Sequence, residues 1–232
     1  MLNIISIIGC GLIGSSILRA IQNKNLAKEV RIFDLSKEVN AYLKKENLCS
    51  NISTDIRQCV SNSDLIIIAT PLSSYKEIIL SIKNDLKKGA ILTDIGSVKK
   101  EVMKIIHNIN LKEINWIPSH PIAGTEESGP KAGYANMFEN RWCIISPPRD
   151  SNAQSIEILK SLWEAMGSKV KIMTPEEHDE ILSLTSHLPH AIAYNIVRTV
   201  INVEDKLKQE VIQYSAGGLR DFTRIAASNP LM

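Results

Sequence analysis

Short apolar runs along the chain alternate with longer segments in which apolar residues recur at helical spacing. The short runs are rich in β-branched residues, and several of them end at glycine or proline, as strands buried in a sheet do. We predict strands at residues 2–9, 30–34, 65–70, 90–94, 114–118, 142–146 and 169–173. We predict helices between them at residues 12–23, 37–46, 73–83, 98–107 and 153–166. This alternation predicts an α/β domain with a mostly parallel sheet.

The pattern changes after Met173, because strand-like runs stop and helical spacing continues to the end of the chain. The segment Thr174-Pro175-Glu176-Glu177 is typical of a helix start, with threonine as the cap, proline in the first turn and Glu177 completing a capping box. No Gly/Ser-rich linker lies nearby. We therefore expect an α/β domain over residues 1–173 and a smaller all-helical domain over residues 174–232.

A glycine motif, Gly9-x-Gly11-Leu12-Ile13-Gly14, follows the first predicted strand and opens the first predicted helix. In a dinucleotide site, Gly9 permits a tight turn, Gly11 admits the pyrophosphate to the backbone, and Gly14 lets the helix pack on the sheet. Leu12 and Ile13 lie between the last two glycines of the motif, and we expect them to contact the cofactor as well. The motif predicts a Rossmann-like domain that binds a dinucleotide.

Asp34 ends the second predicted strand, 20 residues after Gly14. A carboxylate at this position accepts hydrogen bonds from the adenosine ribose and repels the 2′-phosphate of NADP, so we expect NAD, with NADP less favoured. Lys37 nearby leaves some tolerance for the phosphate. The alternative is that the glycines form only a turn and that Asp34 only caps the helix from Lys37.

Two further strand ends contribute to the predicted cofactor site, because ligands of open parallel sheets bind beyond the carboxyl ends of the strands. Thr70 ends the third predicted strand and Pro71 follows it, and Ser97 follows the fourth. We expect all three to contact the cofactor. Ser97 has an alternative role as the cap of a helix that begins at Val98.

Residues 118–130 read Pro-Ser-His-Pro-Ile-Ala-Gly-Thr-Glu-Glu-Ser-Gly-Pro. The segment places His120, several hydroxyls and two adjacent carboxylates among chain-bending residues that no regular element needs. We predict a loop that presents these side chains to a ligand. A histidine beside proline is, as the alternative, a packed loop residue.

Composition limits the partners. The 232 residues are 44% apolar and carry a formal net charge of +2, which is too small to indicate nucleic acid or an anionic membrane surface. No apolar run approaches the roughly 20 residues of a membrane helix. The four cysteines have no C-x-x-C spacing, so we expect reduced, buried thiols, as in a cytoplasmic protein. The small net charge leaves a small polar or anionic molecule as the expected ligand.

The chain resembles the prephenate dehydrogenase family, including its arogenate and dual-specificity members, in five segments. These are Gly9-x-Gly11-Leu12-Ile13-Gly14, Asp94-x-Gly96-Ser97-Val98-Lys99, Ser119-His120-Pro121-x-x-Gly124, Ser186-His187-Leu188-Pro189-His190 and Gly217-Gly218-x-Arg220-Asp221-x-Thr223-Arg224-Ile225-Ala226. Their order and spacing agree over nearly the whole chain. The resemblance implies NAD(P)-dependent oxidative decarboxylation of a cyclohexadienol, on a Rossmann-like domain followed by a helical dimerisation domain.

For that reaction His120 is the candidate base, since a neutral imidazole accepts the proton of the substrate hydroxyl near pH 7. The resemblance implies that Ser97 hydrogen-bonds His120 or that hydroxyl. Glu126 matches a residue that gates the pocket in some relatives through an ion pair with arginine. A solvated loop carboxylate is the alternative for Glu126.

Arg224 is the candidate for binding the ring carboxylate of the substrate, because guanidinium groups bind carboxylates bidentately. Gly217 opens the same motif and is expected to contact the substrate. Arg220 lies four residues earlier on the same helix face. We expect Arg220 to face solvent or to pair near Asp221.

Pro189 predicts a helix start, because proline does not fit a helix interior, and it leaves His190 in the first turn, where the helix field favours anions. We expect His190 to bind the substrate side chain, with Ser186 assisting from the cap region. The spacing His187-x-x-His190 also suits a metal, but no third ligand is suitably spaced, so we expect no metal.

We therefore predict NAD-dependent conversion of prephenate to 4-hydroxyphenylpyruvate in tyrosine biosynthesis. Arogenate or dual specificity is the nearest alternative. A β-hydroxyacid dehydrogenase would use a lysine where the chain becomes helical, and none is found; a nucleotide sensor would explain only the glycines. The chain ends soon after Arg224, where relatives usually continue through more helices, so we expect a helical domain that is either naturally short or trimmed. With neither a chorismate mutase segment before the Rossmann-like domain nor a regulatory domain after it, we expect the monofunctional form, and the resemblance implies a homodimer through the helical domain.

Overall fold

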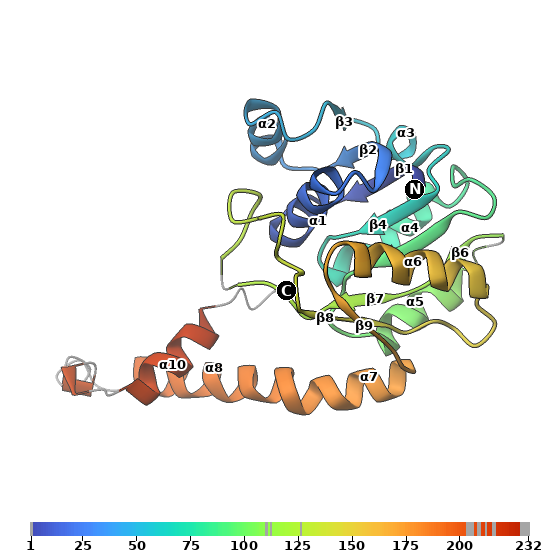
Figure 1. The fold of residues 1–232 in the computed structure, drawn as a ribbon. Coiled ribbons are helices and arrows are strands. Elements are labelled where there is room, and N and C mark those ends of the chain that lie inside the picture. Colours follow the sequence, from blue (N-terminus) through green and yellow to red (C-terminus); the bar gives the residue numbers. More distant parts are fainter. Residues whose placement is uncertain are drawn as a thin grey trace. The chain divides into compact units, whose positions relative to one another are not determined.

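Six parallel strands form the main sheet, in the order β3-β2-β1-β4-β5-β6 (Figure 1). The strands are β1 (Leu2–Ile8), β2 (Ala27–Phe33), β3 (Asn51–Ser53), β4 (Leu65–Ile68), β5 (Ile91–Asp94) and β6 (Asn115–Trp116). The order reverses between β1 and β4, as in a Rossmann fold, where such a point opens a ligand crevice at the carboxyl ends. The predicted α/β class is confirmed.

This computed structural model describes residues 2–109, 111, 113–125, 127–202, 207, 210, 211, 213, 214 and 217–227. The chain forms two compact units, Met1–His178 and Asp179–Met232. The division falls within a helix a few residues after Met173, and the boundary predicted after Met173 stays a prediction.

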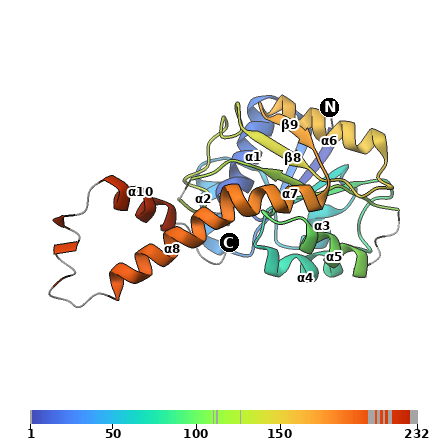
Figure 2. The same cartoon turned by 90° about the horizontal axis from the view of Figure 1, so that it is seen from below.

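Helices cover both faces of the main sheet, with α1 and α6 on one face and α3, α4 and α5 on the other (Figure 2). The helices of this unit are α1 (Leu12–Asn23), α2 (Lys37–Lys45), α3 (Ile56–Val60), the short 3₁₀ helix η1 (Leu72–Ser74), α4 (Tyr75–Ile82), α5 (Lys100–Ile109) and α6 (Ala153–Ala165). The helices predicted from spacing are present within a few residues of their expected bounds. None of the described helices is both long and apolar enough to cross a bilayer.

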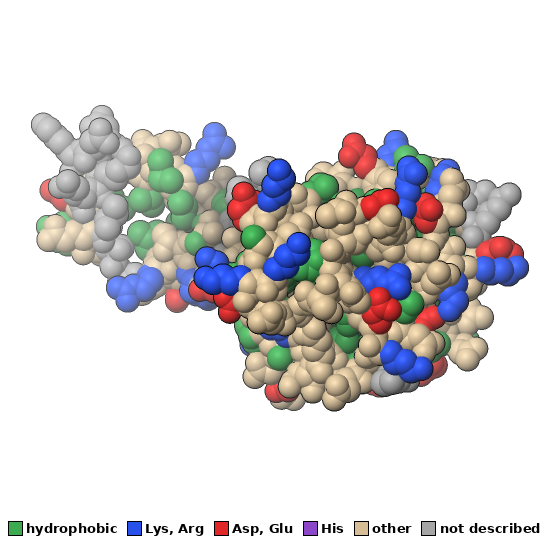
Figure 3. Space-filling view, turned by 90° about the horizontal axis from the view of Figure 1, so that it is seen from above, with side chains coloured by type: hydrophobic (Ala, Val, Ile, Leu, Met, Phe, Trp, Pro, Cys, Tyr) green, Lys and Arg blue, Asp and Glu red, His purple; other side chains and the backbone are tan. Residues whose placement is uncertain are grey.

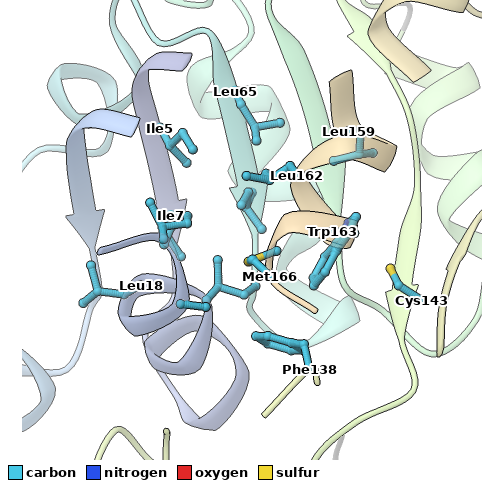
Figure 4. Close-up of a cluster of buried hydrophobic side chains, with 14 of the residues drawn as sticks. Ile5, Ile7, Leu18, Leu65, Phe138, Cys143, Leu159, Leu162, Trp163 and Met166 are labelled. Carbon is cyan, nitrogen blue, oxygen red and sulfur yellow. The ribbon is translucent and has the colours of Figure 1, made fainter. Parts of the chain in front are cut away.

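Two buried clusters hold the layers together, because successive strand residues point to opposite faces of the sheet. Ile7 of β1 packs with α1 and α6, and Ile8 packs with the helices on the other face. Figure 4 shows the first cluster, in which the Phe138 and Trp163 rings meet edge to face at 5.3 Å between centroids. All four cysteines are buried free thiols, as predicted.

A second sheet contains β7 (Ser119–Pro121), β8 (Trp142–Ile145) and β9 (Lys169–Ile172). Strand β7 runs antiparallel to β8, with His120 opposite Ile144, and β8 runs parallel to β9. The prediction of a loop at residues 118–130 is therefore wrong for Ser119–Pro121. The strand forms because β8, which is distant in the sequence, supplies its backbone hydrogen-bond partners. Three residues that include a proline give no local indication of a strand. The short elements β3 and α3 were not predicted either, because a period cannot be recognised over so few residues.

The helical part of the chain begins at α7 (Pro175–Leu182), where the predicted capping box is present. The backbone N–H of Glu177 donates to Thr174 Oγ1, and the backbone N–H of Thr174 donates to Glu177 Oε2 at 2.8 Å. A π-helical turn, Ser183–His187, leads into α8 (Leu188–Ile201), and α10 (Gly217–Ala226) packs on α8.

Basic and acidic side chains are interspersed over the surface seen in Figure 3. This distribution agrees with the small net charge of +2. It gives that face no strong field of one sign, of the kind that steers a large charged partner.

A fully buried ion pair connects the two sheets. Lys99 Nζ donates to Asp94 Oδ2 at 2.7 Å and to the Ser119 carbonyl oxygen at 2.8 Å, and both charged side chains are 0% exposed. Ser119 Oγ in turn donates to the Asp94 carbonyl oxygen at 2.7 Å. Burial raises the pKa of Asp94, and the Lys99 ammonium acts in the opposite direction. The end of β5 is thereby fixed to the start of β7.

We expect Lys99→Met to lower the free energy of unfolding by about 3–5 kcal/mol, because it leaves a buried carboxylate without its cation. Chemical denaturation monitored by circular dichroism measures this change. The matched control is Lys104→Met, which removes an exposed ion pair with Glu101 and should cost about 0–1 kcal/mol. Equal stability of the two variants would contradict the structural role of the Asp94–Lys99 pair.

Candidate active site

The glycine motif forms the turn between β1 and α1. Gly9 has a φ of +89°, and a Cβ there would lie 2.6 Å from the Ala69 carbonyl oxygen. A Cβ on Gly14 would collide with the carbonyl oxygen of Gly9. A Cβ on Gly11 would meet no atom of another described part of the chain within 4 Å, so this position faces open space among the described residues. Two of the glycines are thus required by packing, and Gly11 leaves room for a ligand against the backbone.

Asp34 follows β2 and holds the glycine turn. Its Oδ2 accepts a hydrogen bond from the Cys10 N–H at 2.7 Å, and its Oδ1 accepts one from the Ser36 N–H at 2.8 Å. The cap of α2 is Ser36, whose Oγ accepts from the Val39 N–H. The alternative role of Asp34 as the helix cap is therefore not what the structure shows.

Cys10, inside the glycine motif, has no role as a nucleophile. Burial raises the pKa of its thiol to about 12, with the Asp34 carboxylate acting in the same direction. A thiol with this pKa stays protonated at neutral pH, and only the thiolate is reactive.

Thr70, Pro71 and Ser97 lie after β4 and β5, at the same edge of the sheet as the glycine turn. Thr70 Oγ1 accepts a hydrogen bond from Ser74 Oγ at 2.8 Å. Ser97 is exposed, and its side chain makes no hydrogen bond to another residue that the structure describes. Helix α5 begins at Lys100, two residues later than predicted. Contact between Ser97 and His120 stays a prediction.

The segment after β7 crosses the amino end of α1. Gly124, with a φ of +132°, lies where a Cβ would be 3.6 Å from Ile13 and 3.9 Å from Leu12. Further along, Arg19 Nη2 donates to the Pro130 carbonyl oxygen at 3.1 Å. The two motifs recognised in the sequence, around Gly9 and around His120, are therefore neighbours in the same unit.

His120 is half-buried in β7, and its ring meets that of His178. His120 Nδ1 and His178 Nε2 are 2.8 Å apart, a hydrogen-bond distance, and the ring planes are tilted by 58°. His178 belongs to α7 and is fully buried. No pattern in the sequence indicated a functional role for His178. The one local indication is of burial: His178 lies four residues before the buried Leu182, so both side chains lie on the same face of α7.

In the helical unit, His190 Nδ1 donates to the Ser186 carbonyl oxygen at 2.8 Å. Pro189 occupies the start of α8, as predicted, but His187 before it is also helical, so no free helix end lies here. The prediction that Ser186 assists from a cap region is wrong in this respect. The π-helical turn keeps the backbone helical up to Leu188, so α8 does not begin at a free end. Pro189 fits there because it has no backbone N–H to donate.

The other predicted substrate residues lie on α10 or outside the described part. Gly217 begins α10, and Arg220 and Arg224 are exposed on the same helix. Glu126 lies outside the described residues. Within the described residues, no group of three or more His, Cys, Asp or Glu side chains is arranged to hold a metal ion.

Family models match the chain in two adjoining parts. Residues 17–172 match the nucleotide-binding domain of prephenate dehydrogenase, and residues 174–232 match its dimerization domain. Together they extend over nearly the whole sequence.

Individual relatives give the same result. The chain is 40% identical over 226 residues to a cyclohexadienyl dehydrogenase of Zymomonas mobilis, covering 97% of this chain and 77% of that protein. It is 31% identical to the prephenate dehydrogenase of Bacillus subtilis, covering 100% of this chain and 62% of the relative. A crystal structure of prephenate dehydrogenase from A. aeolicus, in complex with hydroxyphenyl propionate and NAD+, superimposes with a TM-score of 0.90 at 29% identity, covering 100% of this chain and 80% of the other.

The family models, the 40% identity and the superposition agree with the five sequence motifs. On this evidence the chain belongs to the prephenate dehydrogenase family.

Proposed function

We propose that the protein catalyses the NAD-dependent oxidative decarboxylation of prephenate to 4-hydroxyphenylpyruvate, a step of tyrosine biosynthesis. The observation that carries this proposal is the position of His120. A half-buried imidazole, in contact with a second histidine, lies in the strand whose following segment packs at Gly124 against the first turn of α1, in a chain of this family.

The residues present fit a dinucleotide. The space in front of Gly11 suits a pyrophosphate against the backbone. Each carboxylate oxygen of Asp34 accepts one backbone N–H and has a second lone pair for a ribose hydroxyl. The same negative charge disfavours the 2′-phosphate of NADP. We therefore infer NAD, as in the A. aeolicus complex, with Leu12, Ile13, Thr70 and Pro71 completing its site. When bound, the nicotinamide supplies the hydride acceptor.

His120 accepts the proton of the substrate hydroxyl in this proposal. Loss of hydride from the same carbon turns the hydroxyl into a carbonyl oxygen, so its proton needs an acceptor with a pKa near neutrality. Ser97, at the end of β5, orients the hydroxyl or the imidazole. Loss of the ring carboxylate forms an aromatic phenol and needs little further assistance.

Prephenate carries two carboxylates, and the helical unit offers cationic and hydrogen-bonding groups for them. We assign Arg224 to the ring carboxylate, and Gly217, at the start of the same helix, to contact with the substrate. We assign His190 to the side chain of the substrate, because its ring is fixed by the Ser186 carbonyl oxygen. Glu126 is assigned to the pocket entrance.

Arogenate is a second candidate substrate, favoured by the 40% identity to a cyclohexadienyl dehydrogenase. Arogenate differs from prephenate in carrying an amino acid side chain in place of the keto acid. The hydride and proton steps at the ring are the same for both, so the proposed role of His120 holds for either substrate.

An apolar stripe along α7, the π-helical turn and α8 supports a homodimer. Four of its side chains are between 44% and 64% exposed at helical spacing, namely Ile181, Leu184, Leu188 and Ile192. Large apolar side chains gathered on one helix face indicate an interaction surface. Since residues 174–232 match a dimerization domain, we infer that a second copy of the chain covers this stripe. We also infer a cytoplasmic enzyme, where its four thiols stay reduced.

The activity is tested by following reduced nicotinamide absorbance with prephenate and with arogenate, each with NAD and with NADP. We expect reduction of NAD with prephenate, and weaker activity with NADP because of Asp34. A folded protein that binds NAD but reduces it with neither substrate would overturn the proposal and favour a nucleotide sensor.

We expect His120→Gln to lower kcat by about 10²- to 10⁴-fold, the usual contribution of a positioned base, with little change in KM. Glutamine keeps hydrogen-bonding groups but accepts no proton at neutral pH. Steady-state kinetics measures both constants. The control is His107→Gln, an exposed histidine on α5. A change confined to KM in His120→Gln would show that the residue binds substrate and is not the base.

We expect Leu188→Glu to convert the dimer to a monomer, because a carboxylate placed in an apolar interface is desolvated without a partner. Light scattering coupled to size-exclusion chromatography measures the mass. Leu80→Glu is the matched control, since Leu80 of α4 is 43% exposed and Leu188 is 49% exposed. A dimer that survives Leu188→Glu would contradict the assignment of this stripe.

A further inference from the structure

We propose that His178 is a positioning residue for His120. Its Nε2 accepts the Nδ1–H of His120 and so fixes the tautomer in which Nε2 of His120 carries the lone pair that takes the substrate proton. This inference rests on the proposed role of His120 as the base.

Regular elements hold both rings. His120 lies in β7 between two buried residues, Ser119 and Pro121, and is paired opposite Ile144 of β8. His178 lies in the first turns of α7, and its backbone N–H donates to the Thr174 carbonyl oxygen. Thr174 and Glu177 form the capping box that begins this helix. The contact of 2.8 Å between the two rings is therefore made by parts of the fold that are themselves hydrogen-bonded.

A neutral imidazole carries one proton on one of its two nitrogens, so one ring of the pair donates and the other accepts. If His178 donated, His120 would carry its proton on Nε2, and that nitrogen would be unable to accept another. If His120 donates from Nδ1, its Nε2 is the basic atom. Of these two arrangements, only donation by His120 is compatible with Nε2 of His120 acting as the base.

The same bond becomes stronger during the reaction. After Nε2 of His120 takes the proton, the ring is a cation, and its Nδ1–H makes a charge-assisted hydrogen bond to neutral His178. His178 is 0% exposed, so little water competes for that bond. A carboxylate often fills this position beside a catalytic histidine. A second histidine can orient the ring without adding a charge.

Removing such an outer partner of a functional histidine costs about 10- to 100-fold where it has been measured for metal-bound histidines, and we expect a similar loss here. His178→Phe should lower kcat by about that factor and leave KM unchanged, because the ring is no longer oriented. His178→Gln should retain most of the wild-type kcat, since its amide oxygen still accepts from Nδ1 of His120. The control is His107→Phe on α5.

The tautomer is measured directly by ¹⁵N NMR of the protein without substrate or cofactor. The signals of His120 are assigned by their loss in His120→Gln. We expect a protonated Nδ1 and an unprotonated Nε2 in the wild type and in His178→Gln. In His178→Phe we expect Nε2 to become protonated in part of the molecules, because the acceptor at Nδ1 is gone.

Two results would overturn the inference. One is a wild-type His120 protonated mainly on Nε2, and the other is an equal loss of kcat in His178→Phe and His178→Gln. If His178→Phe does not fold, the wild-type spectrum and His178→Gln still decide. A wild-type protein with the expected tautomer but no dehydrogenase activity would instead overturn the proposed function, so the two failures are distinguishable.

Discussion

The Lys99 ammonium lies between two acceptors that belong to different sheets, and the relative placement of the motifs depends on it. Asp94 ends β5 of the parallel sheet, and the carbonyl oxygen of Ser119 belongs to β7. Full burial makes the pair costly to break, since neither charge would be solvated without the other. The strand that carries His120 is thereby fixed to the edge of the sheet at which parallel strands present their ligands.

Two sets of contacts hold the residues near this edge. Asp34 holds the turn of the glycine motif through the Cys10 N–H, and Gly124 lies against Ile13 of α1. In the second set, His178 from α7 contacts the His120 ring. A dinucleotide site and a histidine held in one orientation are thus built within one unit. The chemistry proposed for the family member needs both, because hydride and proton leave the same substrate group.

Much of this organisation could be predicted from the sequence. Alternating runs predicted the mostly parallel sheet and nearly all its helices, because burial on both faces requires continuous apolar strands. Gly9, Gly11 and Gly14 indicated the phosphate turn through backbone constraints that act within a few residues. The capping box at Thr174 and Glu177 could also be predicted, since a cap and its helix are adjacent in the sequence.

The tertiary structure decided what depends on long-range contacts. Residues 119–121 look like a loop by themselves and become a strand only because β8 supplies partners. Pro189 indicated a new helix, and the π-helical turn instead continues the old one. The position of His178 on α7 did not indicate its contact with His120, because the two residues are 58 positions apart in the sequence. By itself the sequence determined the fold class and the glycine turn, both of which are encoded in short patterns, and it led to the choice of His120 as the candidate base. The contact of His120 with His178 required the packing of α7 on β7, which no short pattern encodes.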